Sequence, residues 1–308
     1  MHTTLINFTS GSPRIRCANS WGEMRGPFRP SDIRRLPLAE LSTFVRMMKM
    51  VDPAIMRVLS RDRRHGARAL VARLQVRMER VHREQARIES LYALERERRA
   101  TGFDVIAGVD EAGVAPLAGP VVAAAVILPE EVDLPGLDDS KRLDAGERAA
   151  LYEQIRGTAL AIGTGMAAVE EIDRINILQA TRLAHRRAVA GLGIRPHLVM
   201  LDGRIPADVP VTQLVIIDGD ATCASIAAAS IVAKVTRDRV MAGLADRYPG
   251  YGFAGHKGYA TKAHREAIAR LGLTPIHRRS FVHVEQQLIP ATPEIRYREF
   301  PGGPGTIG

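Results

Sequence analysis

IAGVDEAGVAPLAGPVVAAAVIL, residues 106–128, is the most informative stretch of this 308-residue chain. Its apolar beginning predicts a short buried strand that ends on two adjacent carboxylates, Asp110 and Glu111. Glycines and prolines then mark a loop, and the apolar residues 121–128 predict a second strand that pairs antiparallel with the first. Side chains alternate along a strand, so the two acids point apart unless the backbone turns between them. They are either solvated charges at a strand end or ligands of a bivalent cation.

The composition is that of a globular protein, with 46% hydrophobic and 25% charged residues, and the length suits one large domain and a smaller one. No apolar run reaches the roughly 18 residues that would span a bilayer. The N-terminus lacks the basic start and apolar core of a secretory signal. Cys17 and Cys223 are too far apart for a metal-binding knuckle and too few for a disulfide framework. We therefore expect a cytoplasmic protein that does not associate with membranes.

Positive charge is concentrated in the first part of the chain. Residues 1–100 contain 21 Lys and Arg against 10 Asp and Glu, whereas the remaining residues contain 22 against 24. Such asymmetry indicates nucleic acid or another anionic surface as a partner of the basic part. The alternative interpretation is a well-solvated helical face.

The sequence predicts four segments. Residues 1–38 show no sustained period and cluster Gly, Pro and Arg, so we expect disorder. Residues 39–101 predict a small, basic helical domain, because apolar residues recur at spacings of three and four between Leu70 and Tyr92. Residues 102–290 predict a larger domain, and residues 291–308 a flexible tail.

Strands and helices alternate through the larger domain. After the first two strands we expect, in chain order, a helix from Asp144, a strand at 158–168, a helix at 175–191, strands at 197–203 and 211–217, and a helix at 221–246. This order predicts an α/β fold in which a mixed five-stranded sheet is flanked by helices.

Two further acids follow strands of this sheet. Asp202 ends the strand at 197–203, and Asp220 follows the strand at 211–217, directly before a helix rich in Ala and Ser. If these strand ends converge with that of Asp110 and Glu111, the repulsion among four carboxylates is costly without a divalent metal. Oxygen ligands favour Mg²⁺ or Mn²⁺ over zinc, and two such ions activate a water and stabilise the leaving oxygen of a phosphodiester.

A family resemblance agrees with this interpretation. The chain resembles type 2 ribonuclease H, the bacterial ribonuclease HII, over about residues 105–288, through seven segments in the same order: IAGVDEAG, PLAGPVVAAAVILP, DDSKRL, LDGR, GDATCASIAAASIVAKVTRDR, HKGYATKAH and PIHRRSF. Residues 40–100 are similar to a helical N-terminal extension that some bacterial members carry. The resemblance implies a ribonuclease H-like fold.

The implied activity is that of a metal-dependent endonuclease and hydrolase. Its substrates would be the RNA strand of RNA/DNA hybrids and single ribonucleotides within duplex DNA, and its products a 3′-hydroxyl and a 5′-phosphate. The resemblance assigns four acids as catalytic ligands of Mn²⁺ or Mg²⁺: Asp110, Glu111, Asp202 and Asp220. Asp218 and Asp238 are alternatives for the fourth position. For Asp238 we favour an ion pair on a helix surface with Lys234 or Arg237.

The resemblance also assigns substrate-binding residues. Lys141 matches a lysine that contacts phosphate, and Tyr259 a tyrosine that lies against the ribose at the RNA to DNA step. On sequence alone, Lys141 could equally be a solvated surface lysine and Tyr259 an ordinary loop aromatic. Four histidines have no spacing typical of a metal site, and we expect them to be structural or to face phosphate: His256, His264, His277 and His283.

One departure from the family pattern concerns substrate recognition. Where the family has Gly-Arg-Gly, a tripeptide whose backbone contacts the 2′-hydroxyl and whose Arg assists at phosphate, this chain has Gly113, Val114 and Ala115. Val114 carries no charge, and Ala115 adds a methyl group where glycine allows close approach and unusual φ values.

Two hypotheses follow. The chain is an active nuclease, as the four acids favour, or a degenerate paralogue that binds hybrid or duplex nucleic acid without efficient cleavage, as Val114 and Ala115 favour. A third possibility is a metal phosphatase that acts on small substrates. It agrees less well with the basic N-terminal part, which is more typical of a protein that binds a polyanion. No obligate protein partner is evident from the sequence.

Overall fold

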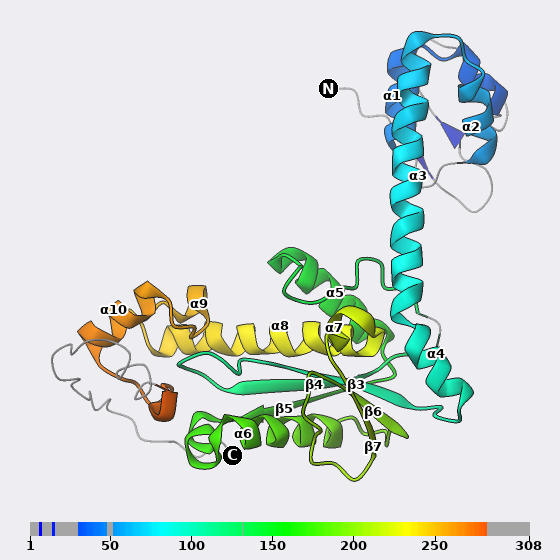
Figure 1. The fold of residues 1–308 in the computed structure, drawn as a ribbon. Coiled ribbons are helices and arrows are strands. Elements are labelled where there is room, and N and C mark those ends of the chain that lie inside the picture. The colour runs from blue at the N-terminus through cyan, green and yellow to red at the C-terminus, as the bar shows by residue number, and fades with distance from the viewer. Residues whose placement is uncertain (1–5, 8–13, 16–29, 48–51, 131, 282–308) are drawn as a thin grey trace. The chain divides into compact units, whose positions relative to one another are not determined.

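The computed structural model describes residues 6–7, 14–15, 30–47, 52–130 and 132–281 (Figure 1). The chain divides into two compact units, Met1–Gln85 and Ala86–Gly308. Most of the segment 1–38, for which we expect disorder, and all of the tail 291–308 lie outside the described residues, as do Cys17 and His283.

The first unit is a small helical assembly with its own apolar core. Its elements are β1 (Ile6–Asn7), β2 (Arg14–Ile15), the 3-10 helix η1 (Pro30–Arg35), α1 (Leu38–Met47), α2 (Pro53–Ser60) and α3 (His65–Leu91), which continues into the second unit. Asp52 caps α2 by accepting a hydrogen bond from the amide of Ala54 at 2.6 Å. Ile33, Leu41, Leu59 and Leu74 are buried together, so η1 and the helices share one core.

The second unit is built on a five-stranded sheet. Its elements are α4 (Ala93–Ala100), β3 (Ile106–Ala112), β4 (Val121–Ile127), α5 (Ala145–Thr158), β5 (Ala161–Ala167), α6 (Val169–Ala190), β6 (Leu198–Asp202), β7 (Thr212–Ile216), α7 (Gly219–Thr222), α8 (Ala224–Arg247), α9 (Phe253–His256) and α10 (Lys262–Leu271). The strand order is β5-β4-β3-β6-β7; β3 and β4, and β4 and β5, pair antiparallel, whereas β3 and β6, and β6 and β7, pair parallel. The predicted mixed α/β fold is confirmed.

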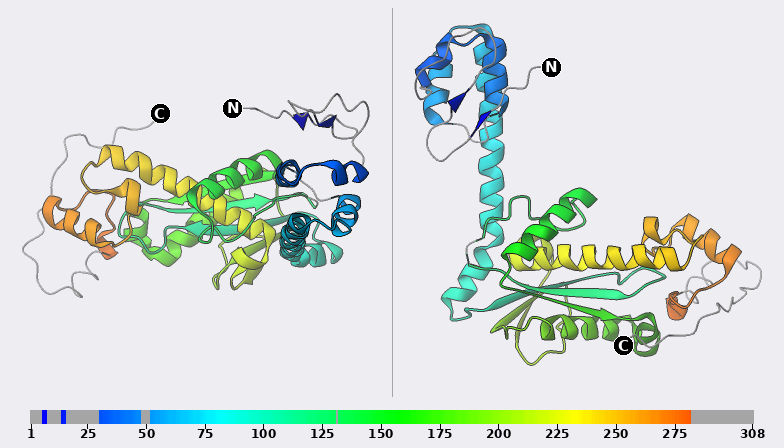
Figure 2. Two further views of the ribbon diagram at one scale, coloured as in Figure 1. Left: turned by 90° about the horizontal axis from the view of Figure 1, so that it is seen from above. Right: turned by 180° about the vertical axis from the view of Figure 1, so that it is seen from behind.

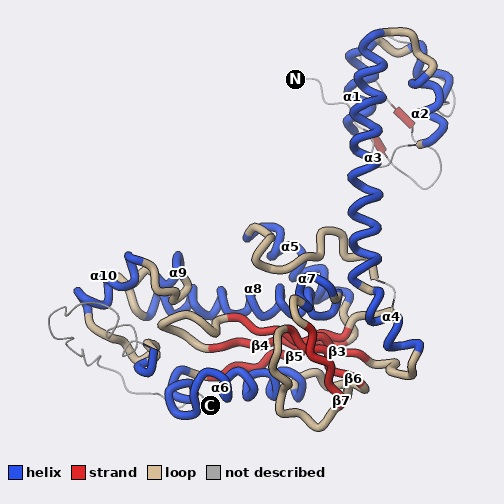
Figure 3. The backbone as a smooth tube through the Cα atoms, viewed as in Figure 1, coloured by secondary structure: helices blue, strands red, loops and turns tan. Residues whose placement is uncertain are grey.

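The sheet lies between two long helices, α8 on one face and α6 on the other (Figures 1 and 3), as the view from behind in Figure 2 also shows. Glycines let both helices approach the strands closely. A Cβ on Gly108 would overlap the backbone of Ser225 and Ile226 in α8, and a Cβ on Gly165 would overlap the carbonyl oxygen of Ala184 in α6. The backbones of these helices therefore rest directly on the sheet.

Both long helices differ from their predicted limits, because the helical backbone is interrupted by one residue in or next to each of them. α6 begins at Val169, before the predicted residue 175, and Asn176 interrupts it with a φ of 65°. The side chain of Asn176 accepts a hydrogen bond from the amide of Gln179 at 3.1 Å, so this residue caps the second half of α6, which is the half that the sequence pattern predicts. Cys223, in extended backbone, likewise separates α7 from α8.

Residues 93–101, which the sequence assigns to the N-terminal domain, belong to the second unit. The carboxylate of Glu95 in α4 is buried and accepts a hydrogen bond from the amide of Ser225 at 2.7 Å, which satisfies a donor in the first turn of α8. Burial raises the pKa of Glu95. Across the described residues, none of the helices combines the length and apolar character that crossing a membrane requires.

Because Gly108 lies directly against α8, we expect even one added methyl group at this position to lower the free energy of unfolding. Gly108→Ala should destabilise the second unit by at least about 1–3 kcal/mol, because the added methyl group has to displace the backbone of α8. Urea-induced unfolding measures this change. The matched control is Gly243→Ala within α8, where a Cβ meets nothing within 4 Å and the helix should gain about 0.5–1 kcal/mol. Equal stabilities of the two variants would contradict this packing.

Candidate active site

Three of the four predicted acids converge at one end of the sheet. Asp110 lies near the end of β3, Asp202 ends β6, and Asp220 lies in α7 just after β7. Each offers one carboxylate oxygen to a group in which all these atoms lie within 4.8 Å of one another. Because β3 and β6 are parallel neighbours, their ends meet at the same edge of the sheet, and the turn after β7 brings Asp220 beside them.

The carboxylates repel one another in a poorly hydrated site. Burial, followed by the charge of Glu111, raises the pKa of Asp110 well above its ordinary value. Burial, followed by the charge of Asp220, raises the pKa of Asp202. A divalent cation would relieve this repulsion, and a donor set made only of carboxylate oxygens suits a hard ion. The residues present therefore fit a divalent metal ion.

Hydrogen bonds orient each acid of the group. The Ser230 hydroxyl on α8 donates to Asp110, and Ser230 itself lies 2.8 Å from the hydroxyl of Ser140. Asp202 Oδ1 accepts from the amide of Gly219 at 2.7 Å. These contacts fix the side-chain rotamers before any ion binds.

Glu111 lies beside this group but on the other face of β3. Its Oε2 is 2.8 Å from Nε2 of the buried His185 on α6. The two acids thus point apart, as alternation along a strand requires. Glu111 is still close enough for its charge to raise the pKa of both Asp110 and Asp202.

Lys141 reaches the acid group from the loop before α5. Its Nζ donates to Asp220 Oδ2 at 2.9 Å, although 74% of the lysine side chain is exposed. Partial burial opposes the charged form of Lys141, but the hydrogen bond to Asp220 and the nearby carboxylates outweigh it, so the net effect is a raised pKa. An ammonium group at the edge of the site is consistent with contact to a phosphate.

The two alternative acids lie elsewhere. Asp218 is exposed, with a φ of 54°, at the N-terminal end of α7. Asp238 forms an ion pair with Lys234 at 2.9 Å along the surface of α8, which is the interpretation we favour from the sequence.

Two buried arginines hold the loop that follows the acids. Arg278 donates from Nη1 to the carbonyl oxygen of Val114 at 2.7 Å and from Nη2 to that of Gly113 at 2.5 Å. Arg237 donates from Nε to the carbonyl oxygen of Pro120 at 3.0 Å. Both guanidinium groups are fully buried, and burial lowers their pKa, for Arg278 to about 9. None of the hydrogen bonds described for these two guanidinium groups involves a carboxylate. Backbone carbonyl dipoles thus compensate the two buried positive charges.

Val114 and Ala115 occupy the outside of this loop. Val114 is 37% exposed, and Ala115 is exposed as well. Gly113 has a φ of 94°, and a Cβ there would overlap Arg237, so this position requires glycine. Among the described non-glycine residues, positive φ values occur at Asn176, Asp218 and Lys257 alone. Ala115 therefore does not occupy the glycine-only conformation that the family pattern leads one to expect.

Tyr259 lies on a second loop that packs against the first. Leu117 donates its amide to the carbonyl oxygen of Gly258 at 2.9 Å, and the guanidinium carbon of Arg237 lies 5.9 Å from the centroid of the Tyr259 ring. The ring is 42% exposed, which leaves a face for a ligand. Arg237 thus contacts both loops that carry candidate substrate-binding residues.

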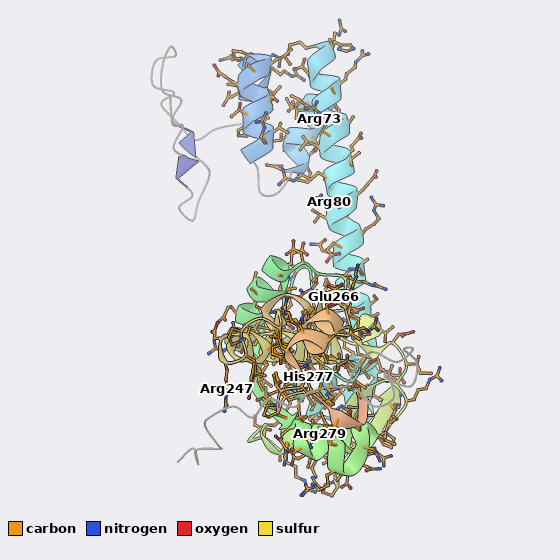
Figure 4. The ribbon with its side chains drawn as sticks, turned by 90° about the vertical axis from the view of Figure 1, so that its left-hand side faces the viewer. Arg73, Arg80, Arg247, Glu266, His277 and Arg279 are labelled. Carbon is orange, nitrogen blue, oxygen red and sulfur yellow. The ribbon has the colours of Figure 1, made fainter. Side chains whose placement is uncertain are left out.

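A chain of histidines fixes the backbone of Tyr259. The amide of Thr274 donates to Nδ1 of His277 at 2.8 Å, so a neutral His277 carries its proton on Nε2 and donates it to Nε2 of His264 at 3.1 Å. His264 then donates from Nδ1 to the carbonyl oxygen of Tyr259 at 2.9 Å. His256 stacks on His264 with ring centroids 4.4 Å apart. Of the four predicted histidines, these three have structural contacts (Figure 4 labels His277).

Comparison with known proteins places this geometry in a family. The family model described as Ribonuclease HII matches residues 107–284, more than half of the chain. The chain belongs to the ribonuclease HII family. It is 51% identical over 253 residues to ribonuclease HII of Myxococcus xanthus, an alignment that covers 82% of this chain and 86% of that protein. It is 44% identical over 287 residues to ribonuclease HII of an Anaeromyxobacter strain, covering 91% of each chain.

A solved structure supports the same assignment. The crystal structure of ribonuclease H2 from Pyrococcus horikoshii aligns with a TM-score of 0.51 and 26% identity, covering 59% of this chain and 98% of that one. As a member of this family, the protein is an endonuclease that hydrolyses the RNA strand of RNA/DNA hybrids and depends on a divalent metal. The predicted family and enzyme class are thus confirmed.

Several residues of the site were not predicted from the sequence. Their contacts are described above. Two of them, Ser230 and Arg237, lie on α8, whereas His185 lies on α6 and Arg278 on the segment after α10. Their partners lie 90, 117, 74 and 164 residues away in the chain, so no local spacing indicates them. For His185 the sequence contains one indication. This histidine stands next to small residues on the helix face that packs on the sheet.

The buried His277 destabilises the folded chain in mild acid. Burial, followed by the charge of His264, lowers the pKa of His277 from 6.5 to about 3. Between these values the unfolded chain binds a proton that the folded chain does not. The contribution of His277 to the free energy of unfolding therefore falls as the pH falls from about 6.5 towards 3, by up to about 1.4 kcal/mol per pH unit, whereas the raised pKa values of Asp110, Asp202 and Glu95 act in the opposite direction. Urea unfolding from roughly pH 7 to pH 4.5 measures the slope.

His277→Gln should flatten this pH dependence because the substituted side chain does not titrate. His197→Gln replaces an exposed histidine of the same unit and should leave the slope unchanged. Identical slopes for the wild type and His277→Gln would show that His277 does not carry the effect.

Proposed function

We propose that the protein is a working repair nuclease. It cuts the RNA strand of hybrids and also cleaves on the 5′ side of single ribonucleotides embedded in duplex DNA, leaving a 3′-hydroxyl and a 5′-phosphate. The observation that carries this proposal is the convergence of Asp110, Asp202 and Asp220 within 4.8 Å, with Glu111 beside them. We assign the protein the cytoplasmic location expected from the sequence.

The acid group supports catalysis by two metal ions, with Asp110, Glu111, Asp202 and Asp220 as ligands. Mg²⁺ and Mn²⁺ are the ions that oxygen donors of this kind favour. Bound there, a pair of such ions would supply an activated water and a stabilised leaving oxygen. The chain's own contribution is to hold the carboxylates in fixed rotamers through Ser230 and the amide of Gly219.

Backbone geometry supports ribonucleotide recognition despite the altered tripeptide. Arg278 binds the carbonyl oxygens of Gly113 and Val114. In a trans peptide the N–H points opposite to the C=O of the same unit, so the amides of Val114 and Ala115 point away from Arg278. Such amides are suitable donors to a 2′-hydroxyl or phosphate oxygen, and their direction does not depend on an Arg or Gly side chain.

Lys141 and Tyr259 complete the proposed substrate site. Lys141 would contact a phosphate near the acids, and the exposed face of Tyr259 would lie against the ribose, where the 2′-hydroxyl distinguishes RNA from DNA. Intact acids and an ordered loop both favour the active enzyme over a degenerate paralogue.

The helical first unit would add nonspecific affinity for the duplex. Arg61, Arg63 and Arg68 are exposed between the end of α2 and the first turns of α3, and Arg73 and Arg80 extend from α3 (Figure 4). Guanidinium groups on an exposed surface bind phosphates independently of sequence. We assign residues 39–101 this binding role and residues 102–290 the catalytic role.

The decisive experiment compares three duplexes in the presence of Mg²⁺ or Mn²⁺: DNA with one embedded ribonucleotide, a continuous RNA/DNA hybrid, and DNA alone. We expect cutting 5′ of the lone ribonucleotide and within the hybrid, and none of the DNA. Cutting of the hybrid alone would show that Val114 and Ala115 abolish recognition of single ribonucleotides. Binding without cutting would favour the degenerate paralogue.

Asp110→Asn tests the acid group in the same assay. Cleavage should fall by orders of magnitude, because an amide is a poor metal ligand, while the free energy of unfolding should not decrease, because a repelled buried charge is removed. Asp218→Asn is the matched control, since this nearby acid is exposed and outside the group, and asparagine tolerates its positive φ. Retained cleavage in Asp110→Asn would refute the assignment.

Salt dependence tests the role of the first unit. Replacing Arg61, Arg63 and Arg68 together by Gln should weaken duplex binding and reduce the slope of log K against log salt by about 0.9 for each phosphate that the protein no longer neutralises. Turnover at saturating substrate should change little. The triple replacement by Lys keeps the charge and should keep most of the slope; an unchanged slope in the Gln variant would exclude this surface from binding.

A further inference from the structure

The two adjacent acids of β3 face different helices. In the antiparallel pairing of β3 with β4, Asp110 lies opposite Ala124 and Glu111 opposite Ala123. Ala124 packs in the cluster formed with α8, and Ala123 packs in the cluster formed with α6. The side chain of Glu111 therefore leaves the strand on the face of the sheet opposite to Ser230. A group on the α6 side has to direct its carboxylate towards the other acids.

His185 is the group on that side that contacts Glu111. Its Nε2 lies 2.8 Å from Glu111 Oε2, and only 3% of the residue is exposed. The backbone around it is fixed, because the neighbouring Ala184 and Ala188 are fully buried and lie against Gly165 of β5. A rigid helix thus places the imidazole at a defined point next to a flexible glutamate.

The protonation of the pair follows from its surroundings. A carboxylate oxygen accepts, so the proton of the 2.8 Å contact lies on Nε2 of His185. The other ring nitrogen, Nδ1, is buried and has no hydrogen-bond partner among the described residues. Contact with Glu111 is therefore the polar interaction that the structure gives this imidazole.

We propose that His185 is a positioning residue for Glu111 in the metal site. It holds one oxygen of Glu111 by a hydrogen bond and leaves the other oxygen for a cation shared with Asp110, Asp202 and Asp220. The inference rests on the proposed metal-dependent function and extends it to a residue that touches neither substrate nor metal.

Repulsion explains why Glu111 needs such a partner. The charge of Glu111 raises the pKa of Asp110 and Asp202, so before metal binds, these acids push its carboxylate away. The Glu111 side chain is 24% exposed, so packing alone does not fix it. The bond to His185 opposes both the repulsion and the rotamer freedom, so the fourth ligand is in place when the ion arrives.

The test measures Mn²⁺ binding to the full chain by calorimetry and by the EPR signal of free Mn²⁺. His185→Met fills a similar volume without a donor and should raise the dissociation constant for Mn²⁺ about 10- to 100-fold, the usual effect of removing the partner of a metal ligand. His185→Gln keeps an N–H within reach of Glu111 and should stay within a few-fold of the wild type. Binding of hybrid without metal should be unchanged in both variants, because His185 is buried.

Two controls separate the hydrogen bond from packing. Arg186→Gln changes the next residue, an exposed arginine paired with Asp208 at 3.1 Å, and should bind Mn²⁺ like the wild type. In a Glu111→Ala background, His185→Gln and His185→Met should bind Mn²⁺ equally, because the acceptor is gone. This comparison remains informative if His185→Met alone folds poorly.

The outcomes distinguish this inference from the proposed function. A wild type that binds no Mn²⁺ would refute the metal site itself. Normal Mn²⁺ binding by the wild type together with equal binding by His185→Met would refute only the role of His185. A loss that is the same in His185→Gln as in His185→Met, or that persists in the Glu111→Ala background, would assign the effect to packing and overturn the inference.

Discussion

The alternation of side chains along β3 is the constraint on which the active site depends. Two acids at adjacent positions of a strand cannot point to the same side, so Asp110 faces α8 and Glu111 faces α6. Each acid therefore takes its hydrogen-bonding partner from a different helix, Ser230 for the first and His185 for the second. Both layers of the fold thus contribute to the proposed metal site, and Gly108 and Gly165 let the two helices lie against the sheet.

Sequence patterns predict the features that local spacing encodes. Apolar runs identify the five strands, and the acids that follow them mark the edge of the sheet where the site forms. The breaks at Asn176 and Cys223 were not predicted, because a single capping residue within an apolar pattern does not alter its period. The contacts of Arg237 and Arg278 were not predicted either, because backbone carbonyls more than 100 residues away have no signature in the sequence.

The backbone conformation changes the interpretation of the departure from the family tripeptide. Considered as side chains, Val114 and Ala115 remove a charge and a glycine. In the structure the constrained position is Gly113, which is retained, and the two altered residues lie on the exposed side of a loop whose carbonyls are bound by Arg278. The proposed backbone-mediated recognition would tolerate such changes, because it depends on the direction of the loop amides and not on these side chains.

The arginine-bound loop also bears on how fast a substrate is captured. Ordering a flexible residue costs about 1–2 kcal/mol of conformational entropy. For residues 113–120 that cost is met during folding, since Arg237 and Arg278 bind carbonyl oxygens of this loop from the protein interior. In the proposed mode of binding, a duplex would meet a loop that is already held in place, so its association would need no slow closing step. Discrimination between ribose and deoxyribose would then depend on the lifetime of the complex.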